Sequence, residues 1–215
     1  MEQLRRLFEN NRSLVEQITR DDPDFFSRRA GKQEPHFLFI GCADSRVPIE
    51  TLTGVAPGEM FVHRNIANQV VAADLNLLSV LQYAVEVLDV KHVIVCGHYQ
   101  CGGVKAAMGD ESFGLVDHWL AGVRDQVRRH KLELDSIADP TDRFNRVVEL
   151  NVLRQVHNLS RTPIVQNAWK RGRRPLLHGM VYDIHDGRLR ELVLEVDGQD
   201  KVRALLEADR RGVGV

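Results

Sequence analysis

The chain has 215 residues, enough to bury a sizeable core in one domain, and its composition excludes a repeat array, a collagen-like chain or a long disordered tail. It carries 29 lysines and arginines against 30 aspartates and glutamates, so its formal charge is −1 and no global field favours nucleic acid or a membrane surface. The three cysteines, an odd and sparse set, favour metal ligation or burial over a disulfide framework. We therefore expect a small-molecule partner.

The first twenty residues place apolar side chains at helical spacing with charges between them, which predicts an amphipathic helix. These charges leave no apolar stretch typical of a secretory signal, and no later run is long enough to span a bilayer. We therefore expect a cytoplasmic location. Asp22-Pro23 then predicts the start of a short second helix.

Two apolar runs predict buried parallel strands whose carboxyl ends carry metal-binding residues. Residues 36–42 end at Cys42, and residues 91–97 end just before His98, with a further strand at 60–63 and a helix at about 74–88 between them. Gly102-Gly103 opens another helix directly after His98 and Cys101. Because α/β proteins place their chemistry at the carboxyl ends of strands, we expect one shared site there.

The remaining sequence completes an α/β fold. Residues 111–171 are mostly helical in pattern, with breaks at Asp139-Pro140 and Thr162-Pro163. Residues 176–184 and 188–196 predict two strands joined through Asp186-Gly187, and a last helix is expected near Leu205. We predict a single domain over residues 1–215: a mostly parallel central sheet flanked by helices, with an antiparallel edge hairpin near the C-terminus and an N-terminal helical arm over residues 1–30.

Cys42, His98 and Cys101 supply the three protein ligands that a catalytic zinc site uses when it keeps a fourth position for water. Each residue also has a plain structural explanation, since free cysteines and lone histidines are common in cores. Cys96, amid an apolar strand, is interpreted as a core residue. Asp44 and Arg46 follow Cys42 closely and can form an ion pair that aims a carboxylate at a metal-bound water, or else a structural salt bridge near a turn.

Residues 42–47 (CADSRV) and 97–104 (GHYQCGGV) resemble the two signature motifs of β-carbonic anhydrases, and the flanking stretches are similar to bacterial members of that family. The resemblance implies one Zn²⁺ per subunit on Cys42, His98 and Cys101, and an Asp44–Arg46 dyad that orients a zinc-bound hydroxide. It implies a lyase that reversibly hydrates carbon dioxide to bicarbonate and a proton. It further implies a homodimer or homotetramer in which the N-terminal helices contact the neighbouring subunit.

The resemblance also implies a substrate pocket and a regulatory site. In the pocket Gln33 reaches a substrate oxygen across the dimer interface, and ordinary packing is the alternative for each of its members: Gln33, Phe61, Ile66, Tyr83, Gly102 and Gly103.

Gly41, Val47, Arg64 and Tyr182 resemble the regulated type II subgroup, in which Asp44 leaves Arg46 and becomes the fourth zinc ligand in a closed form. A regulatory bicarbonate site would then involve Phe39, Arg64 and Tyr182. Phe39 departs from the tryptophan usual there, which removes an N–H donor.

Three other functions compete with this interpretation. A hydrolase of carbon disulfide or carbonyl sulfide would use the same zinc chemistry, and a non-enzymatic zinc protein or bicarbonate sensor would lack a working dyad. A nucleic-acid patch would use the positive charges of Lys170, Arg171, Arg173 and Arg174, which otherwise form a solvated helix end.

Overall fold

The computed structural model describes residues 1–172, 174–198 and 200–203, which form two units, Met1–Glu34 and the part of the chain from Pro35 onward. The first unit holds α1 (Glu2–Asp21), the predicted amphipathic helix, none of whose residues is buried. The second predicted helix begins later than expected, because Asp22-Pro23 opens a turn and α2 spans Ser27–Ala30. The turn is closed by main-chain hydrogen bonds such as that from Arg28 N to Asp24 O, 3.1 Å.

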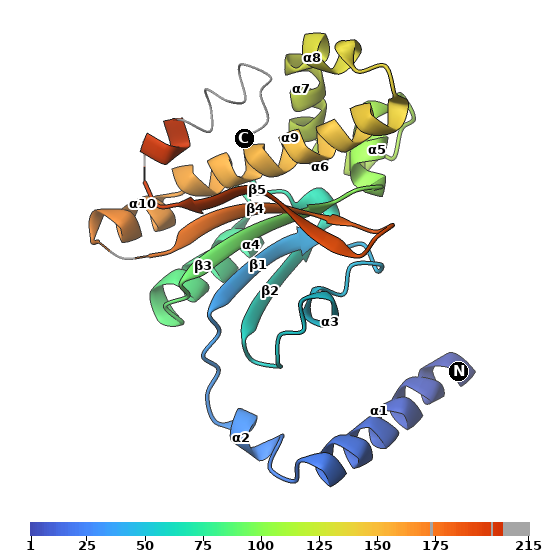
Figure 1. Ribbon diagram of the computed structural model, residues 1–215, viewed down its shortest axis with the longest axis vertical. Coiled ribbons are helices and arrows are strands. Elements are labelled where there is room, and N and C mark those ends of the chain that lie inside the picture. Colours follow the sequence, from blue (N-terminus) through green and yellow to red (C-terminus); the bar gives the residue numbers. More distant parts are fainter. Residues whose placement is uncertain (173, 199, 204–215) are drawn as a thin grey trace. The chain divides into compact units, whose positions relative to one another are not determined.

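The second unit is built on a five-stranded sheet of order β2-β1-β3-β4-β5 (Figure 1). Strands β1 to β4 run parallel, and β5 pairs antiparallel with β4, so the predicted mostly parallel sheet with an edge hairpin is confirmed. The strand bounds are β1 (Phe37–Cys42), β2 (Met60–Asn65), β3 (His92–His98), β4 (Leu176–Asp183) and β5 (Arg188–Val196).

Helices follow the strands as the apolar periodicity predicts. The expected helix near residues 74–88 is α4 followed by a π-helical turn, η2. The breaks predicted at Asp139-Pro140 and Thr162-Pro163 are confirmed, because the Asp139 and Thr162 side chains cap the helices that begin there. The short α3 and the 3-10 turn η1 were not predicted, and the helix expected near Leu205 lies outside the described residues. The bounds are α3 (Ile49–Thr53), η1 (Ile66–Asn68), α4 (Leu75–Gln82), η2 (Tyr83–Val87), α5 (Gly102–Met108), α6 (Leu115–Trp119), α7 (Ala121–Arg129), α8 (Lys131–Ser136), α9 (Pro140–Arg161) and α10 (Pro163–Lys170).

No helix in the described part of the chain is long and apolar enough to cross a membrane. The main core lies on the face of the sheet that α9 covers, where Leu38 and Ile40 of β1 point, while Phe39 points to a smaller cluster on the opposite face. Because both faces are buried, β1 and β3 are almost continuously apolar.

Helix α9 packs closely on the strand that carries His98. A Cβ placed at Gly97 of β3 would lie 2.6 Å from Val152 Cγ2 and 3.3 Å from Val148 Cγ1, both on α9. The absence of a side chain at Gly97 therefore sets the distance between helix and sheet.

We predict that Gly97→Ala destabilises the fold by about 1–3 kcal/mol, because the added methyl group overpacks this contact. Urea denaturation would measure it. Gly122→Ala is the matched control. Gly122 lies on helix α7, and the nearest atom to a Cβ placed there is 3.8 Å away. Equal stability of the Gly97 variant and wild type would contradict the close approach.

A pair of histidines, His92 and His178, lies near the amino ends of β3 and β4, at the edge of the sheet opposite His98. The main-chain N–H of Glu195 donates to His178 Nδ1 over 3.3 Å, so His178 Nε2 carries the proton that it donates to His92 Nδ1 over 3.0 Å. Glu195 lies at an irregularity of β5 and has a φ of 53°. Burial lowers the pKa of both histidines below the ordinary value.

We predict that acid weakens the fold through this pair. The unfolded chain binds more protons than the folded chain once the pH falls below about 6.5, so stability decreases with falling pH in that range. His178→Gln keeps an acceptor and a donor without titrating, and its melting temperature should depend less on pH between about 7.5 and 5.5. A pH dependence as steep as that of wild type and of the exposed-site control His118→Gln would contradict the prediction.

Candidate metal centre and active site

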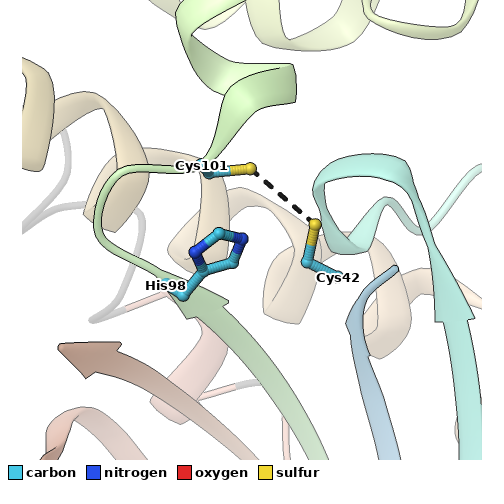
Figure 2. A group of neighbouring side chains, drawn as sticks. All are labelled: Cys42, His98 and Cys101. Atoms are coloured by element: carbon cyan, nitrogen blue, oxygen red, sulfur yellow. Dashed lines mark hydrogen bonds between the residues drawn. The ribbon is translucent and has the colours of Figure 1, made fainter. Parts of the chain in front are cut away.

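Three buried side chains that can bind a metal meet at the carboxyl edge of β1 and β3 (Figure 2). Cys42 is the last residue of β1, His98 is the last residue of β3, and Cys101 caps the start of α5. Their ligand atoms all lie within 4.8 Å of one another. The structure thus brings together the three residues that the sequence singled out, whereas Cys96 lies in the smaller core cluster and burial raises its pKa to about 12.

The two thiols of this centre share one proton. Their Sγ atoms lie 3.9 Å apart, and the hydrogen bond between them lowers the pKa of Cys42 to about 4 while it raises the pKa of Cys101 well above its ordinary range. Main-chain groups of Ala67 and Asp44 also lower the Cys42 pKa by hydrogen bonding. A divalent cation would take the place of the shared proton and allow both sulfurs to be thiolates.

His98 presents one nitrogen to the centre. Its Nδ1 is 2.9 Å from the Tyr99 carbonyl oxygen, which accepts hydrogen bonds, so Nδ1 carries the proton in the neutral ring. His98 Nε2 is therefore a free lone pair, and it is buried without a hydrogen-bond partner among the described residues. An orphaned imidazole nitrogen beside two thiols fits a Cys-His-Cys metal site.

Tyr99, whose carbonyl orients His98, is held by a chain of charged groups. Its hydroxyl donates to Glu149 over 2.9 Å, Glu149 accepts from Arg146 over 3.1 Å, and Arg146 donates to Glu133 over 2.6 Å. Burial and the neighbouring Glu149 carboxylate raise the pKa of Tyr99 above its ordinary range. Tyr99 therefore stays a hydrogen-bond donor and fixes the turn that follows β3.

Asp44 and Arg46 form a bidentate ion pair. Arg46 Nε donates to Asp44 Oδ1 over 2.9 Å and Arg46 Nη2 donates to Oδ2 over 2.7 Å, while the Arg46 main-chain N–H also donates to Oδ1 over 2.9 Å. This pairing lowers the pKa of Asp44 to about 2. Asp44 Oδ2 lies 3.7 Å from His98 Nε2, so an ionised carboxylate faces the centre.

Arg64 holds the loop that carries Asp44. Its Nη2 donates to the Asp44 carbonyl oxygen and its Nη1 donates to the Val47 carbonyl oxygen, each over 2.8 Å. Phe39, Val47 and Tyr182 are buried together beside it in the smaller core cluster. The Phe39 ring occupies the space where a Cβ of Gly41 would lie, so Gly41 is required for that ring position.

The other predicted pocket residues are distributed over both units. Gln33 belongs to the first unit, Met1–Glu34. In the second unit the Phe61 and Tyr83 rings lie 6.0 Å apart, and Ile66 and Tyr83 are exposed. Gly102 and Gly103 begin α5, and a Cβ at Gly103 would lie 2.8 Å from Ile66 Cγ2. Ile66 and Gly103 are therefore neighbours near Cys101.

The described basic residues near the end of α10, which the sequence offered as a nucleic-acid patch, lie on the surface. Lys170, Arg171 and Arg174 are exposed, Arg173 lies outside the described residues, and Arg171 pairs with Glu86 over 3.7 Å. These features fit a solvated helix end.

Three supporting features were not predicted from the sequence. They are the hydrogen bond from Tyr99 to Glu149, the contacts of Arg64 with loop carbonyl groups, and a row of amide side chains on α9. The last had a usable signal, because Asn151, Gln155 and Asn158 recur at helical spacing on a face that is otherwise apolar.

The fold and this edge of the sheet define an α/β protein with a candidate metalloenzyme centre. A family model described as carbonic anhydrase matches residues 37–189. The chain is 46% identical over 193 residues to a carbonic anhydrase of Emericella nidulans, covering 90% of this chain and 85% of that one. It is 37% identical to a carbonic anhydrase of Pseudomonas aeruginosa, covering 76% of each.

Solved structures agree with these matches. A Coccomyxa β-carbonic anhydrase in complex with acetazolamide is 41% identical with a TM-score of 0.89, over 95% of this chain and 93% of that one. A tetrameric β-carbonic anhydrase of Sordaria macrospora is 39% identical with a TM-score of 0.85, over 89% of this chain and 98% of that one. The chain belongs to the β-class carbonic anhydrase family, and it is an enzyme of that family. These relatives come from different organisms, among them Emericella nidulans and Pseudomonas aeruginosa, so the matches show the β class and do not single out its bacterial members or the type II subgroup.

We predict that Cys42→Ser greatly weakens metal binding, because a serine hydroxyl at this position does not supply a thiolate. After metal loading and dialysis, elemental analysis should find one divalent ion per wild-type chain and far less in the variant. Cys96→Ala is the matched control, since Cys96 is buried outside the centre. Equal metal content in wild type and Cys42→Ser would remove Cys42 from the ligand set.

Proposed function

We propose that this chain catalyses the reversible hydration of carbon dioxide to bicarbonate and a proton, with one Zn²⁺ per subunit held by Cys42, His98 and Cys101. The observation that carries this proposal is the ionised Asp44 carboxylate, 3.7 Å from the orphaned His98 Nε2, beside two buried thiols. A purely structural metal site has no need of such a carboxylate.

Zinc is the metal that best suits this set of donors. Two thiolates and one imidazole are soft and borderline ligands, which favour zinc over magnesium or calcium. Three protein ligands leave a fourth position for water in a tetrahedral site. A bound zinc ion would supply a water ligand whose pKa is about 7, as is established for carbonic anhydrases.

Asp44 would act on the proton of the attacking water. Its carboxylate stays ionised because Arg46 donates two side-chain hydrogen bonds to it. Asp44 can therefore accept a hydrogen bond and orient the nucleophile toward the carbon of carbon dioxide. Arg46 also donates to the Gln100 carbonyl oxygen over 3.3 Å, which ties the dyad to the turn between His98 and Cys101.

The substrate pocket would be completed by a second copy of the chain. Phe61, Ile66, Tyr83, Gly102 and Gly103 would form its apolar wall, and Gln33 of the arm would reach a substrate oxygen across a dimer interface. Residues 1–30 would be the dimer-contacting arm of a single domain, and exposed apolar side chains on α1 such as Leu7 and Phe8 support this role. The related Sordaria enzyme is described as tetrameric, so this proposal covers a homodimer or a homotetramer. We place the protein in the cytoplasm because its three cysteines are free thiols, as is usual in a reducing compartment.

The type II switch is a further part of the proposal. In the closed form Asp44 would leave Arg46 and become the fourth zinc ligand, which needs a small movement because Oδ2 is already 3.7 Å from His98 Nε2. A regulatory bicarbonate would bind near Phe39, Arg64 and Tyr182 and compete for the Arg64 donors that now hold the Asp44 and Val47 carbonyls. Phenylalanine in place of the usual tryptophan offers no N–H to that anion, so we expect weak bicarbonate regulation.

The test is stopped-flow hydration of carbon dioxide by zinc-loaded protein from about pH 6.5 to 9, since a water pKa near 7 governs the rate. We expect activity that rises with pH in wild type and is lost in Cys101→Ser. Arg46→Gln should lower the rate by about 10²-fold or more, because Asp44 loses its orienting partner.

An inactive, fully zinc-loaded wild type would reject carbon dioxide hydration, and turnover of carbon disulfide or carbonyl sulfide by the same sample would favour the alternative hydrolase. A rise no steeper than the titration of one group would reject the Asp44 switch and leave the hydratase in place, whereas a rate independent of pH through neutrality would contradict the expected water pKa as well.

A further inference from the structure

The turn Ile66–Asn68, η1, adopts a backbone conformation that its residues do not favour. Ala67 has φ 59° and ψ 31°, and Asn68 has φ 47°, so two consecutive residues with side chains are left-handed. A Cβ makes this conformation unfavourable, although asparagine tolerates it better than alanine. Something outside the turn must therefore hold Ala67 in place.

Buried amides hold it. The Ala67 carbonyl oxygen accepts from Gln69 Nε2 over 2.7 Å and from Asn151 Nδ2 over 3.0 Å. Asn151 Oδ1 in turn accepts from Gln69 Nε2 over 2.8 Å and from Gln155 Nε2 over 2.9 Å. Gln69, Asn151 and Gln155 are each no more than 2% exposed, so these bonds form away from solvent.

The amide row comes from one face of α9. Asn151, Gln155 and Asn158 are spaced four and three residues apart, and Gln155 Oε1 also accepts the main-chain N–H of Val70 over 2.9 Å. Leucine or valine on this face would pack α9 against the sheet equally well, since neighbouring Val152 and Val156 already do so. Asn151 and Gln155 therefore do more than pack, since their hydrogen bonds reach Ala67, Gln69 and Val70 in the segment after β2.

That segment borders the metal centre on two sides. Ala67 and Cys42 are buried in the same core cluster, and the main-chain group of Ala67 lowers the pKa of Cys42. A Cβ on Gly103, at the start of α5, would lie 2.8 Å from Ile66 Cγ2 and 3.6 Å from the Ala67 main-chain nitrogen. A displacement of Ala67 would therefore disturb the surroundings of Cys42 and the position of Ile66 together.

We propose that Asn151 and Gln155 are positioning residues of the metal centre, which hold the left-handed turn so that Ala67 stays packed beside Cys42 and Ile66 stays against Gly103 at the start of α5. This inference rests on the proposed zinc site. Neither amide touches a reacting atom, and each acts through Ala67. Outer-shell hydrogen bonds to a ligand tune both metal affinity and the electron density that the ligand donates.

The test compares Asn151→Leu with Asn158→Leu, an identical change on the same helix face. Asn158 Nδ2 donates to the Val70 carbonyl oxygen and to Gln155 Oε1, each over 3.0 Å, so among the described residues its side-chain bonds lie outside the left-handed turn. Each variant is loaded with Co²⁺, and the thiolate-to-cobalt charge-transfer band is recorded beside the melting temperature. Zinc affinity and kcat/KM are measured on the same samples.

We expect Asn151→Leu to shift the cobalt band and to lower zinc affinity or kcat/KM by about 10- to 100-fold. Asn158→Leu should lower the melting temperature without moving the band. An unshifted band and unchanged zinc affinity in Asn151→Leu, with equal melting-temperature losses in both variants, would overturn the proposal and leave a structural role.

Gln155→Met keeps the test decisive if Asn151→Leu does not fold, because it removes a donor to Asn151 while Asn151 and Ala67 remain. Its band should shift in the same direction by a smaller amount, and an unmoved band in the folded variant would overturn the proposal. These readouts are separate from hydration, so a zinc-loaded wild type without carbonic anhydrase activity would reject the proposed function alone.

Discussion

The parallel pairing of β1 with β3 is the contact on which the centre depends. Gly41 lies opposite Cys96 in this register, so the two strands end side by side with Cys42 and His98 at the same edge. Side chains alternate along a strand, and a slip of one residue would turn Cys42 to the opposite face of the sheet. The tight fit of α9 against Gly97 opposes a slip of β3, because Gly97 is the single glycine of that strand and a side chain in its place would meet Val152.

Charge compensation explains the groups around the ligands. Two thiolates buried at one point repel each other, so the hydrogen bond between the two sulfurs lowers the pKa of Cys42 and raises the pKa of Cys101. The surroundings nevertheless supply partial positive charge, from main-chain N–H groups directed at Cys42 and from the N-terminal end of α5 beside Cys101. Arg46 compensates Asp44 separately. The site is thus arranged for a cation with two sulfur ligands and a carboxylate held just outside them.

Much of this arrangement could be predicted from sequence, because it is encoded locally. Apolar runs that end in glycine and cysteine or histidine predicted β1 and β3, and the spacing of His98 and Cys101 predicted their shared turn. Asp139-Pro140 and Thr162-Pro163 predicted the breaks after which α9 and α10 begin. The left-handed turn at Ala67 could not be predicted, because contacts more than 80 residues away along the chain impose it. Arg64 was singled out from the sequence, but its contacts could not be predicted for a related reason: its partners are carbonyl groups, and no residue identity marks where a loop will direct them.

The irregularity of β5 near Glu195 affects more than the histidine that it contacts. β5 is an edge strand, and a regular edge offers a row of unpaired main-chain groups to which another unfolded or misfolded chain can add. Here the register shifts along β5, and its exposed positions carry the charged Arg188, Arg190, Glu191 and Glu195 beside Leu189 and Leu194. An incoming strand would find its hydrogen bonds out of step and would have to desolvate charges. The same bulge that directs an N–H to His178 thus protects this edge of the sheet against aggregation.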